Sequence, residues 1–523
     1  MKKQVLKKVK QKSKSVFAKI VFSRTMVTIL LLLIQALVLF SIPLWFAKYR
    51  LAVYACSSVL SALAIIYIIN DESNPGFKMA WIIPICVLPV FGTLLFLFVN
   101  WNFGYFGLKK AFARSLRQTQ DYLCIDRETQ KRLQESDRGL ANLAKYLENV
   151  ENYPAYCKTK TQYFSSGEEA YQVMIEELKK AEKFIFMEYF IVEEGFMWNS
   201  ILDILMKKAQ EGVEVRFMYD GMCSLVLLPY NYPEKLRKRG IQAKQYAPVK
   251  PLLSTHQNYR DHRKIMVIDG KVAFTGGINL ADHYINLVCK YGYWKDVAMK
   301  IEGPAVKSFS AMFLQMWNLT ETASGDVGKY LTVQSPPYQE EKGIVIPYGD
   351  GPTNEEHIAE SVYIDMIYRA EKYVHIMTPY FVVDNEMLTA LIYAAKRGID
   401  VELLFPYVSD SPLTFAMGRT YYPQLLKAGV KIYEFTPGFV HAKVFVSDDV
   451  CATVGSVNLD YRSLYHHFEC GIYLYRQDCI KKMEKDFQNT REKSIQINMD
   501  DYNDIPLYKR FAGRALRLIG PLV

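Results

Sequence analysis

Three apolar runs dominate the first hundred residues of the chain. Residues 26–46, 51–69 and 79–99 contain no charged side chain, and the third run includes two prolines. Each run has the roughly 20 residues that a helix needs to cross the hydrocarbon core of a bilayer. The pattern therefore predicts an N-terminal transmembrane region over residues 25–105.

Beyond this region the pattern becomes that of a folded α/β protein. Residues 106–160 are polar and helix-prone, which predicts a helical connector. Helical periodicity over 168–181 is then followed by a strand-like run at 183–192. The same order recurs later, with a helical segment at 355–370 and a strand at 372–383.

This recurrence indicates two copies of one α/β domain. The sequence Ala-Glu-Lys-Phe at 181–184 returns as Ala-Glu-Lys-Tyr at 370–373. A fixed internal repeat is the mark of a duplicated structural unit. We therefore expect a first domain over residues 161–330 and a second over residues 343–523.

The positive charge is concentrated at the N-terminus. Residues 1–24 hold eight lysines, one arginine and no acid, so of the net charge of +10 only +1 belongs to the remaining 499 residues. Such a tail suits the anionic cytoplasmic face of a membrane. A near-neutral remainder argues against a nucleic-acid partner, which would require basic residues over the folded part.

The basic clusters leave the membrane topology open. Four cations at 109–117 follow the third apolar run and favour a cytoplasmic catalytic part in a multi-pass protein of the cell membrane. Three crossings would place the two basic clusters on opposite sides, so either one of the first two runs does not cross or one cluster is overruled. Nine cysteines without paired spacing predict free thiols.

One stretch with identical spacing occurs twice, 179 residues apart. In each copy a lysine lies two residues after a histidine, an aspartate seven after, glycine fourteen after and asparagine seventeen after. The first copy consists of His262, Lys264, Asp269, Gly276, Gly277 and Asn279, and the second of His441, Lys443, Asp448, Gly455, Ser456 and Asn458.

Each copy predicts a strand, a turn and a return strand. Side chains two apart on a strand share a face, so each histidine lies beside its lysine. Asp269-Gly270 predicts a tight hairpin. Gly276 and Gly277 would let backbone N–H groups approach an anion. Imidazole, ammonium, amide and bare backbone together suit a phosphoryl group, and two matched copies argue against ordinary strand residues.

A carboxylate follows each motif, Asp296 after the first and Glu469 after the second. A reactive histidine needs an acceptor on its second ring nitrogen, which fixes the tautomer, and we expect these residues to provide it. Asp269 and Asp448 complete the motifs. We expect them to fix the turn or a neighbouring lysine rather than to transfer a proton.

The repeated HxKxxxxD motif resembles that of the phospholipase D superfamily, and the likeness extends from about residue 110 to the end. The turn at 74–76, Ala80-Trp81 and the run 88–92 resemble the two-span membrane hairpin of bacterial cardiolipin synthases. The extra run at 26–46 departs from that pattern. The resemblance implies two pseudo-twofold-related domains with mixed sheets flanked by helices, which build one active site.

The resemblance also implies a reaction. A cardiolipin synthase converts two molecules of phosphatidylglycerol into cardiolipin and glycerol through a phosphatidyl-histidine. By this resemblance His262 is the nucleophile and His441 the acid and base. No metal or cofactor is expected, since positive side chains hold the phosphate. The residues expected to bind its oxygens are Lys264, Lys443, Asn279 and Asn458.

Other functions stay open at this stage. With water as the acceptor, the same site would be a phospholipase D. A superfamily nuclease is disfavoured by the apolar runs and the near-neutral catalytic part, and a non-catalytic membrane scaffold by two complete motifs. Residues 507–523 carry four cations and no acid, which fits either an amphipathic helix on a lipid surface or a packed terminal helix. The sequence does not indicate an oligomeric state.

Overall fold

The computed structural model describes most of the chain. The described residues are 33, 34, 37, 40, 41, 50–100, 103–223, 227–229, 231–249, 258–320, 326–353 and 356–522. The predicted basic tail and nearly all of the first apolar run lie outside these residues. All nine cysteines are described and are free thiols.

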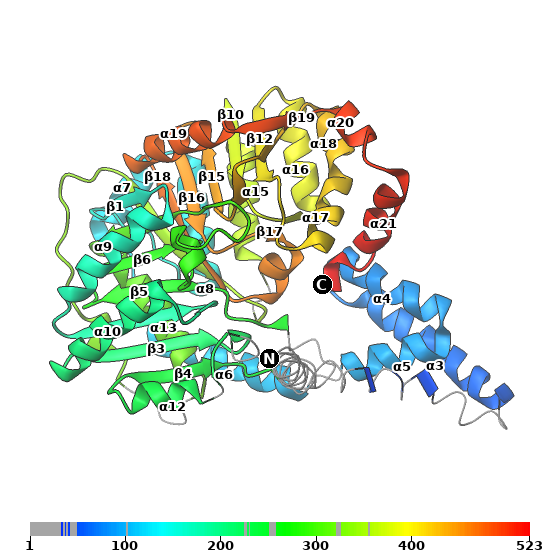
Figure 1. Cartoon of the computed structure of the whole chain (residues 1–523), viewed down its shortest axis with the longest axis horizontal. Coiled ribbons are helices and arrows are strands. Elements are labelled where there is room, and N and C mark those ends of the chain that lie inside the picture. Colours follow the sequence, from blue (N-terminus) through cyan, green and yellow to red (C-terminus); the bar gives the residue numbers. More distant parts are fainter. Residues whose placement is uncertain are drawn as a thin grey trace, which may run out of the picture.

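The second and third apolar runs form a helical hairpin (Figure 1). Its helices are α3 (Arg50–Asn70), α4 (Pro75–Val87) and α5 (Pro89–Val99). The third run, with its two prolines, forms two helices, because the chain breaks at Leu88, which has φ −131° and ψ 74°. Pro89 causes the break, since its ring disfavours the helical conformation of the residue before it. A 2.7 Å hydrogen bond between Ser61 and Thr93 joins α3 to α5.

The predicted membrane crossings are not confirmed. Within the described ranges, no helix is both long enough and apolar enough to span a membrane. The segments at 51–69 and 79–99 are helical, but the first crossing, at 26–46, falls almost entirely on residues outside the described part.

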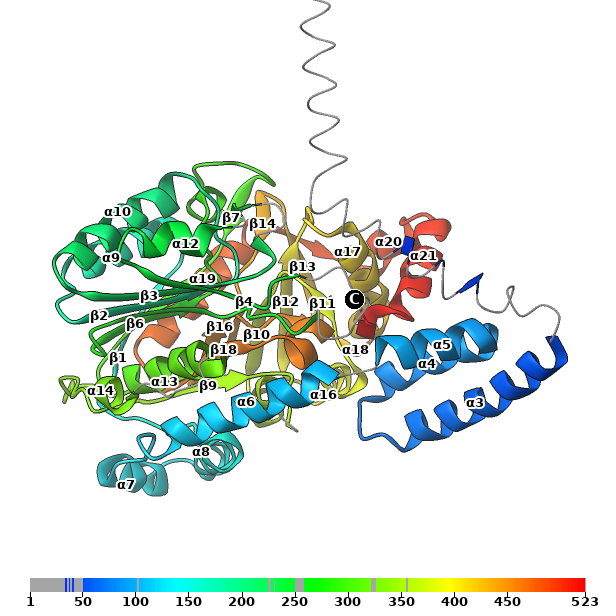
Figure 2. The same cartoon turned by 90° about the horizontal axis from the view of Figure 1, so that it is seen from below.

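Three helices connect the hairpin to the first sheet. They are α6 (Phe103–Gln120), α7 (Arg127–Glu135) and α8 (Arg138–Glu151). Helix α6 runs along the lower side of the molecule in Figure 2, next to α13 (Val306–Trp317). The Ser115 hydroxyl donates a buried hydrogen bond of 2.8 Å to the Gln315 carbonyl and fixes that contact.

The first half contains a seven-stranded mixed sheet in the order β1-β8-β6-β5-β2-β3-β4. Strand β2 pairs in parallel with β3 and antiparallel with β5. The bounds are β1 Lys160–Phe164, β2 Phe184–Tyr189, β3 Glu214–Asp220, β4 Gln242–Tyr246, β5 Lys264–Ile268, β6 Val272–Gly276 and β8 Ala298–Glu302.

The second half repeats this order and adds one strand. Its sheet reads β9-β18-β16-β15-β10-β12-β13-β19, so each strand of the first sheet has a counterpart in the same place. The bounds are β9 Ile344–Asp350, β10 Tyr373–Met377, β12 Asp400–Pro406, β13 Lys431–Phe435, β15 Val444–Ser447, β16 Cys451–Gly455, β18 Glu469–Tyr475 and β19 Ser494–Ile497.

Helices flank both sheets, as the sequence predicts for α/β domains (Figure 1). Besides α13, the first half has α9 Gly167–Lys179, α10 Phe196–Gln210, α12 Tyr232–Arg237 and α14 Gly328–Leu331. The second half has α15 Ile358–Arg369, α16 Asn385–Lys396, α17 Pro412–Gly418, α18 Tyr422–Ala428, α19 Cys479–Arg491, α20 Met499–Asn503 and α21 Leu507–Arg517.

Two short backbone pairings join the halves. Strand β7 (Tyr293–Lys295) pairs in parallel with β14 (Gly438–Val440) of the other half. An isolated parallel bridge joins Asp261 to Phe468. Each pairing ends next to one motif histidine, so the fold brings the two motifs together at the interface between the halves.

Candidate active site

The motif histidines and lysines lie where the central strands begin. His262 precedes Lys264 at the start of β5, and His441 and Lys443 precede β15. All four side chains are buried. Each lysine ammonium donates to the backbone carbonyl of its own histidine, at 2.5 Å in both halves. This local bond holds the lysine beside the imidazole, as the two-residue spacing predicts.

The carboxylates cross between the halves. Glu469 accepts from Nδ1 of His262, at 2.9 and 3.0 Å for its two oxygens. Asp296 accepts from Nδ1 of His441 at 2.7 Å. Each carboxylate therefore orients the histidine of the other motif, not the one that it follows in the chain. With Nδ1–H donating to a carboxylate, Nε2 of each histidine is left for chemistry.

Backbone contacts between the halves produce this crossing. The His262 amide donates to the Phe468 carbonyl at 2.9 Å, directly before Glu469 in the chain. The His441 amide donates to the Lys295 carbonyl at 2.7 Å, directly before Asp296. Each histidine is thus attached, through its main chain, to the residue that precedes its carboxylate partner.

The two carboxylates are supported differently. The Ser456 hydroxyl donates to Glu469, whereas its counterpart Gly277 has no side chain. A Cβ at Gly277 would lie 2.1 Å from Oδ1 of Asp296, so only glycine fits there. In place of a hydroxyl, the backbone amide of Val297 donates a hydrogen bond of 2.8 Å to Oδ1 of Asp296.

The motif aspartates are structural. Asp269 accepts hydrogen bonds of 2.7–2.8 Å from the amides of Glu182, Lys183 and Phe184 at the start of β2. Asp448 accepts three equivalent bonds where β10 starts. Each aspartate lies five positions after its lysine, which along a strand is a distance of roughly 16 Å. The expectation that they fix local structure fits this geometry, and they do not belong among the reacting groups.

The motif glycines serve strand packing. A Cβ on Gly276 would lie 2.5 Å from the Val297 carbonyl oxygen, and a Cβ on Gly455 2.3 Å from that of Cys470. The next amides are also occupied, since Gly277 N donates to Val297 O and Ser456 N to Cys470 O. The prediction that these backbones receive an anion is wrong, because the neighbouring strand fills the space beside them.

The two asparagines differ in their surroundings. Asn279 accepts from the Ile191 amide at 3.0 Å and donates to the Tyr284 hydroxyl at 2.8 Å, so most of its amide is committed to the fold. Asn458 is also buried, and its Oδ1 has no hydrogen-bond partner among the described residues. Of this pair, Asn458 is the better placed to bind a ligand.

Burial and like charge set the protonation of the cluster. Burial lowers the pKa of His262 well below its ordinary value, and Lys264 and Lys443 add to the effect. Burial likewise lowers the pKa of His441 to about 4. The lysine ammonium groups respond in the same way, with pKa values lowered by burial to about 8 for Lys264 and about 7 for Lys443.

The carboxylate partner of His441 stays ionised. Burial opposes ionisation of Asp296, but the charges of His441 and Lys443 hold its pKa below the usual value. The site therefore combines two neutral imidazoles, each oriented through Nδ1, with two lysine ammonium groups whose pKa values lie close to neutral pH. This arrangement suits nucleophilic attack by an imidazole on an anionic phosphorus centre.

Two aromatic residues outside the repeated motifs, which the sequence analysis did not assign to the site, lie beside the histidines. Trp294 lies two residues before Asp296, and His467 two before Glu469. The ring centroids of Trp294 and His441 are 5.3 Å apart with an interplanar angle of 41°, and those of His467 and His262 are 5.3 Å apart at 40°. Their common offset from the carboxylates is the sequence signal that would have identified them.

The nitrogen atoms of this aromatic pair have no hydrogen-bond partner among the residues that the structure describes. Within the described part of the chain, Nε1 of Trp294 and both ring nitrogens of His467 are buried without one. Nδ1 of His467 lies 3.6 Å from Glu469, beyond hydrogen-bonding distance. A buried N–H without a partner is costly, which makes these groups candidates for binding substrate.

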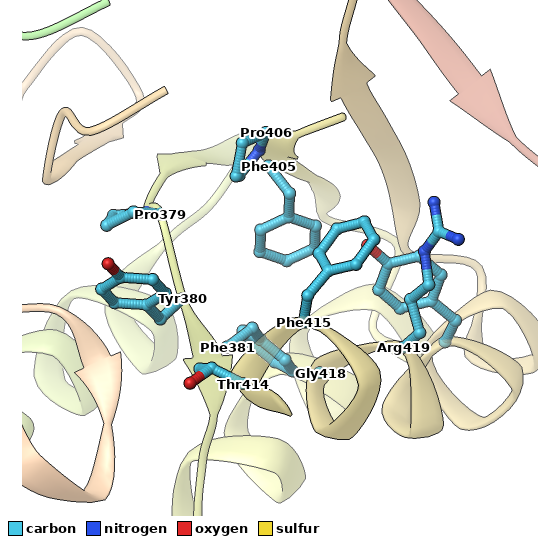
Figure 3. Close-up of a pocket in the computed structure, with 10 residues that line it drawn as sticks. Pro379, Tyr380, Phe381, Phe405, Pro406, Thr414, Phe415, Gly418 and Arg419 are labelled. Carbon is cyan, nitrogen blue, oxygen red and sulfur yellow. The ribbon is translucent and has the colours of Figure 1, made fainter. Parts of the chain in front are cut away.

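An aromatic pocket lies next to this cluster, lined by residues from the ends of β10 and β12 and from α17. Figure 3 shows the rings of Phe405 and Phe415 next to each other in its lining, with Tyr380 at one side. The Tyr380 ring lies 6.5 Å from that of Phe439, which in turn lies 6.0 Å from His441. The pocket is therefore one aromatic layer away from the histidine.

A metal ion has poor support at the histidines. Among the described residues, His262, His467 and Glu469 are close enough together to hold one. However, Glu469 already binds Nδ1 of His262, and the ammonium groups of Lys264 and Lys443 act on the same histidine. Their positive charge favours an anion over a cation here.

Comparisons with known proteins agree with this architecture. A family model described as "Cardiolipin synthase, PLD-like domain" matches residues 174–317 and 363–491. Another, described as the N-terminal part of phospholipase D nucleases, matches residues 59–99. The solved structure of phosphatidylserine synthase from Haemophilus influenzae superimposes with a TM-score of 0.54 at 17% identity, covering 74% of this chain and all of that one. It supports the fold.

Curated relatives extend the match over most of the chain. Cardiolipin synthase from Alkalihalophilus pseudofirmus is 35% identical over 477 residues, which cover 89% of this chain and 93% of the relative. Cardiolipin synthase 2 from Bacillus anthracis is 34% identical over 457 residues, 87% and 88% of the two chains. An uncharacterized protein of Streptococcus mutans is 46% identical over 462 residues.

The duplicated fold and its paired histidines define a phosphatidyltransferase of the phospholipase D type. Within that class, the chain belongs to the cardiolipin synthase family.

Proposed function

We propose that this protein joins two molecules of phosphatidylglycerol into cardiolipin and releases glycerol. The observation that carries the proposal is the pair of crossed histidine–carboxylate contacts, because transfer through a covalent intermediate needs two separate groups. One histidine must bond to phosphorus, and another must move the proton of the alcohol. Relatives of known name that match most of the chain are cardiolipin synthases, which supports these substrates.

The first half-reaction replaces glycerol by histidine. Nε2 of His262 bonds to phosphorus, and the bond from phosphorus to the glycerol oxygen breaks. His441 takes up a proton at Nε2 when the phosphate anion binds, and it gives this proton to the departing glycerol oxygen. Lys264 and Lys443 bind the phosphate oxygens, and the bound anion restores the charge that burial removes from these ammonium groups. The product is a phosphatidyl-histidine and free glycerol.

The second half-reaction reverses these roles for a new alcohol. Nε2 of His441 takes the proton from a glycerol hydroxyl of the next phosphatidylglycerol. The resulting oxygen bonds to phosphorus and the bond to His262 breaks, which gives cardiolipin and the starting enzyme. Water in place of this alcohol would give phosphatidic acid.

Trp294, His467 and Asn458 supply additional polar contacts in this proposal. Their buried polar atoms are without partners in the described structure, and the two rings lie beside His441 and His262. We assign them to the glycerol hydroxyls and phosphate oxygens of the two headgroups. The aromatic pocket of Figure 3 would then receive apolar parts of the lipid.

The location in the cell also belongs to the proposal. We assign the protein to the cell membrane as a multi-pass protein, with residues 25–105 as the membrane region and residues 1–24 as a cytoplasmic tail. The domains 161–330 and 343–523 then lie on the cytoplasmic side, next to the basic cluster at 109–117. The absence of acid from the tail and its nine cations support this orientation.

Purified protein incubated with headgroup-labelled and acyl-labelled phosphatidylglycerol tests the reaction. The proposal predicts acyl label in cardiolipin and one labelled glycerol released for each cardiolipin. Label in phosphatidic acid alone, with no cardiolipin at saturating lipid, would instead show a hydrolase. A variant carrying both His262→Ala and His441→Ala provides the matched control for contaminating activity.

A further inference from the structure

The last helix of the chain has its apolar face directed away from the protein. Helix α21 is followed by a short turn at Gly520–Leu522. Three of its large apolar side chains are strongly exposed, Leu507 at 76%, Phe511 at 74% and Tyr508 at 70%. Leu518 and Ile519, directly after the helix, are exposed as well.

These side chains lie together on one face. Successive residues of an α-helix turn by about 100°, so Leu507, Leu518, Phe511, Tyr508 and Ile519 fall within an arc of roughly 120°. A contiguous apolar stripe of this width ordinarily faces the core of a protein. Here it faces outward along its whole length.

The packing face of α21 is on the opposite side. Gly513 is buried, about 180° from the middle of the apolar arc. A Cβ on Gly513 would lie 2.5 Å from the carbonyl oxygen of Ala416 in α17, so the two helices are in backbone contact. On the same side, the Arg517 guanidinium lies over the Tyr421 ring at 3.7 Å. Leu516 also packs on this side, against a buried cluster that includes Met417. The helix is therefore held by Gly513, Leu516 and Arg517, while Leu507, Tyr508 and Phe511 remain uncovered.

The charges around the apolar face indicate what covers it. The segment 507–523 has four cations and no acid. Lys509 and Arg514 are both exposed. Arg514 lies about 20° outside one edge of the apolar arc, and Lys509 about 80° beyond the other. Long cationic side chains at the borders of an apolar stripe extend toward anionic headgroups while the stripe enters the acyl boundary.

The C-terminal end of α21 lies next to the N-terminal hairpin. The C-terminal turn packs against α4 beside the aromatic residues of 461–466, and Figure 1 shows both segments at the same end of the molecule. The hairpin itself exposes Val59, Ile66, Met79 and Val87. A membrane surface would cover both exposed regions together.

We infer that α21 is a membrane-binding helix, which lies in the headgroup region of an anionic bilayer with Leu507, Phe511 and Leu518 buried among the acyl chains. Helix α17 lies between α21 and the aromatic pocket, so this binding holds the pocket close to the lipid surface (Figures 1 and 3). The inference concerns membrane contact, and it does not depend on the reaction catalysed.

Depth-dependent fluorescence quenching tests the inference on the full-length protein. The background carries serine at the four exposed cysteines, Cys56, Cys86, Cys124 and Cys289. An environment-sensitive probe is attached to Phe511→Cys or, as the matched control, to Lys485→Cys on the exposed side of α19. The protein is reconstituted into vesicles of phosphatidylcholine and phosphatidylglycerol with brominated acyl chains. The probe at 511 should lose at least half its emission, and the probe at 485 almost none.

The charges give a second, graded readout. In the probe-labelled protein, Lys509→Gln and Arg514→Gln should each weaken the insertion of the helix into anionic vesicles by roughly fivefold. A probe at 511 that is quenched no more than the probe at 485 would overturn the inference. A second outcome would also overturn it. If the emission of the probe at 511 is blue-shifted but not quenched by bromine, and the protein has the mass of a dimer, a second copy of the chain covers the face. In the protein labelled at 511, a folded variant with Leu518→Asp shows whether loss of a neighbouring apolar side chain reduces the quenching.

Discussion

The two halves of the active site share one backbone plan and differ in the residues that complete it. Each half supplies a histidine and a lysine at the start of a central strand, and a carboxylate for the histidine of the other half. In the first half the carboxylate is Asp296 beside Gly277, and in the second it is Glu469 beside Ser456. The longer acid occurs with a hydroxyl that holds it, and the shorter acid with a glycine that makes room.

The ring beside each histidine differs in the same way. The ring beside His441 is that of Trp294, which can donate one hydrogen bond and accept none. The ring beside His262 is that of His467, which can donate or accept. Duplication therefore preserved the geometry while the surroundings of the two histidines diverged. This divergence is what two different tasks, nucleophile and acid–base, would require.

The largest expected effect comes from removing either histidine. His262→Ala and His441→Ala should each reduce cardiolipin formation by at least about 10⁴-fold, because a nucleophile and its acid–base partner act as a unit. Steady-state transfer of labelled phosphatidylglycerol measures it. A loss of only a few-fold would remove that histidine from the mechanism.

Exchanging the residues beside the two carboxylates, Gly277 next to Asp296 and Ser456 next to Glu469, should have the next largest effect. Gly277→Ser places a Cβ 2.1 Å from Asp296, so the carboxylate must leave His441, and we expect a loss of about 10²–10⁴-fold, typical for a lost acid–base group. Adding Asp296→Glu recreates the pair found in the second half and should recover at least part of the rate.

The reciprocal change provides the control for that exchange. Ser456→Gly removes one hydrogen bond from Glu469 without a steric clash, so a loss of roughly tenfold is expected. If Gly277→Ser cost no more than Ser456→Gly, the close fit around Asp296 would not matter for the reaction.

A moderate effect is expected from pH. Burial lowers the pKa of Lys443 to about 7 and that of Lys264 to about 8, so the empty enzyme loses its phosphate-binding charge as the pH rises through this range. The value of kcat/KM, which reports the free enzyme, should therefore fall above about pH 7. Lys443→Arg keeps its charge and should move this decline toward the pKa of Lys264. An unchanged profile in this variant would show that Lys443 does not cause the decline.

The smallest expected effect is that of a chelator. The ammonium groups neutralise the phosphate, so activity in EDTA should stay within about twofold of the untreated value. A His467→Asn variant assayed beside the wild type shows whether any metal effect arises from the group His262, His467 and Glu469. Loss of activity in EDTA and its return with one divalent ion would contradict the mechanism.

The sequence predicted the duplicated α/β fold and selected the histidines, lysines and asparagines of the site, because their spacing is repeated, but it did not select Trp294 and His467. It found Asp296 and Glu469 but not which histidine each one binds. That pairing depends on contacts of Lys295 and Phe468 with the opposite half, and no spacing within one repeat reports a contact between repeats. The asymmetric environment of the histidines was therefore not predictable from the motif.

Other differences have equally local causes. Gly276 and Gly455 occupy the same position in the two copies, but they allow close approach of the next strand and do not bind an anion. The sequence shows two prolines in the third apolar run, but the structure was needed to show that the helix breaks before Pro89 and continues through Pro84. For α21 the sequence shows that the apolar residues fall on one face. Only the structure shows that the opposite face, with Gly513, packs against the protein, so that the apolar face points outward.

The central claim is the crossed pairing of carboxylates and histidines. It can be measured with a phosphatidyl ester of p-nitrophenol, a leaving group that departs without a general acid. Four variants are compared for the burst of p-nitrophenol in the first turnover, namely His262→Ala, Glu469→Gln, His441→Ala and Asp296→Asn.

Crossed pairing predicts that Glu469→Gln behaves like His262→Ala and Asp296→Asn like His441→Ala. With His262 as nucleophile, the first pair shows no burst and the second pair retains one. An interchange of the two outcomes would reassign the nucleophile and leave the pairing intact. The account is contradicted if Asp296→Asn loses the burst together with His262→Ala while Glu469→Gln keeps it.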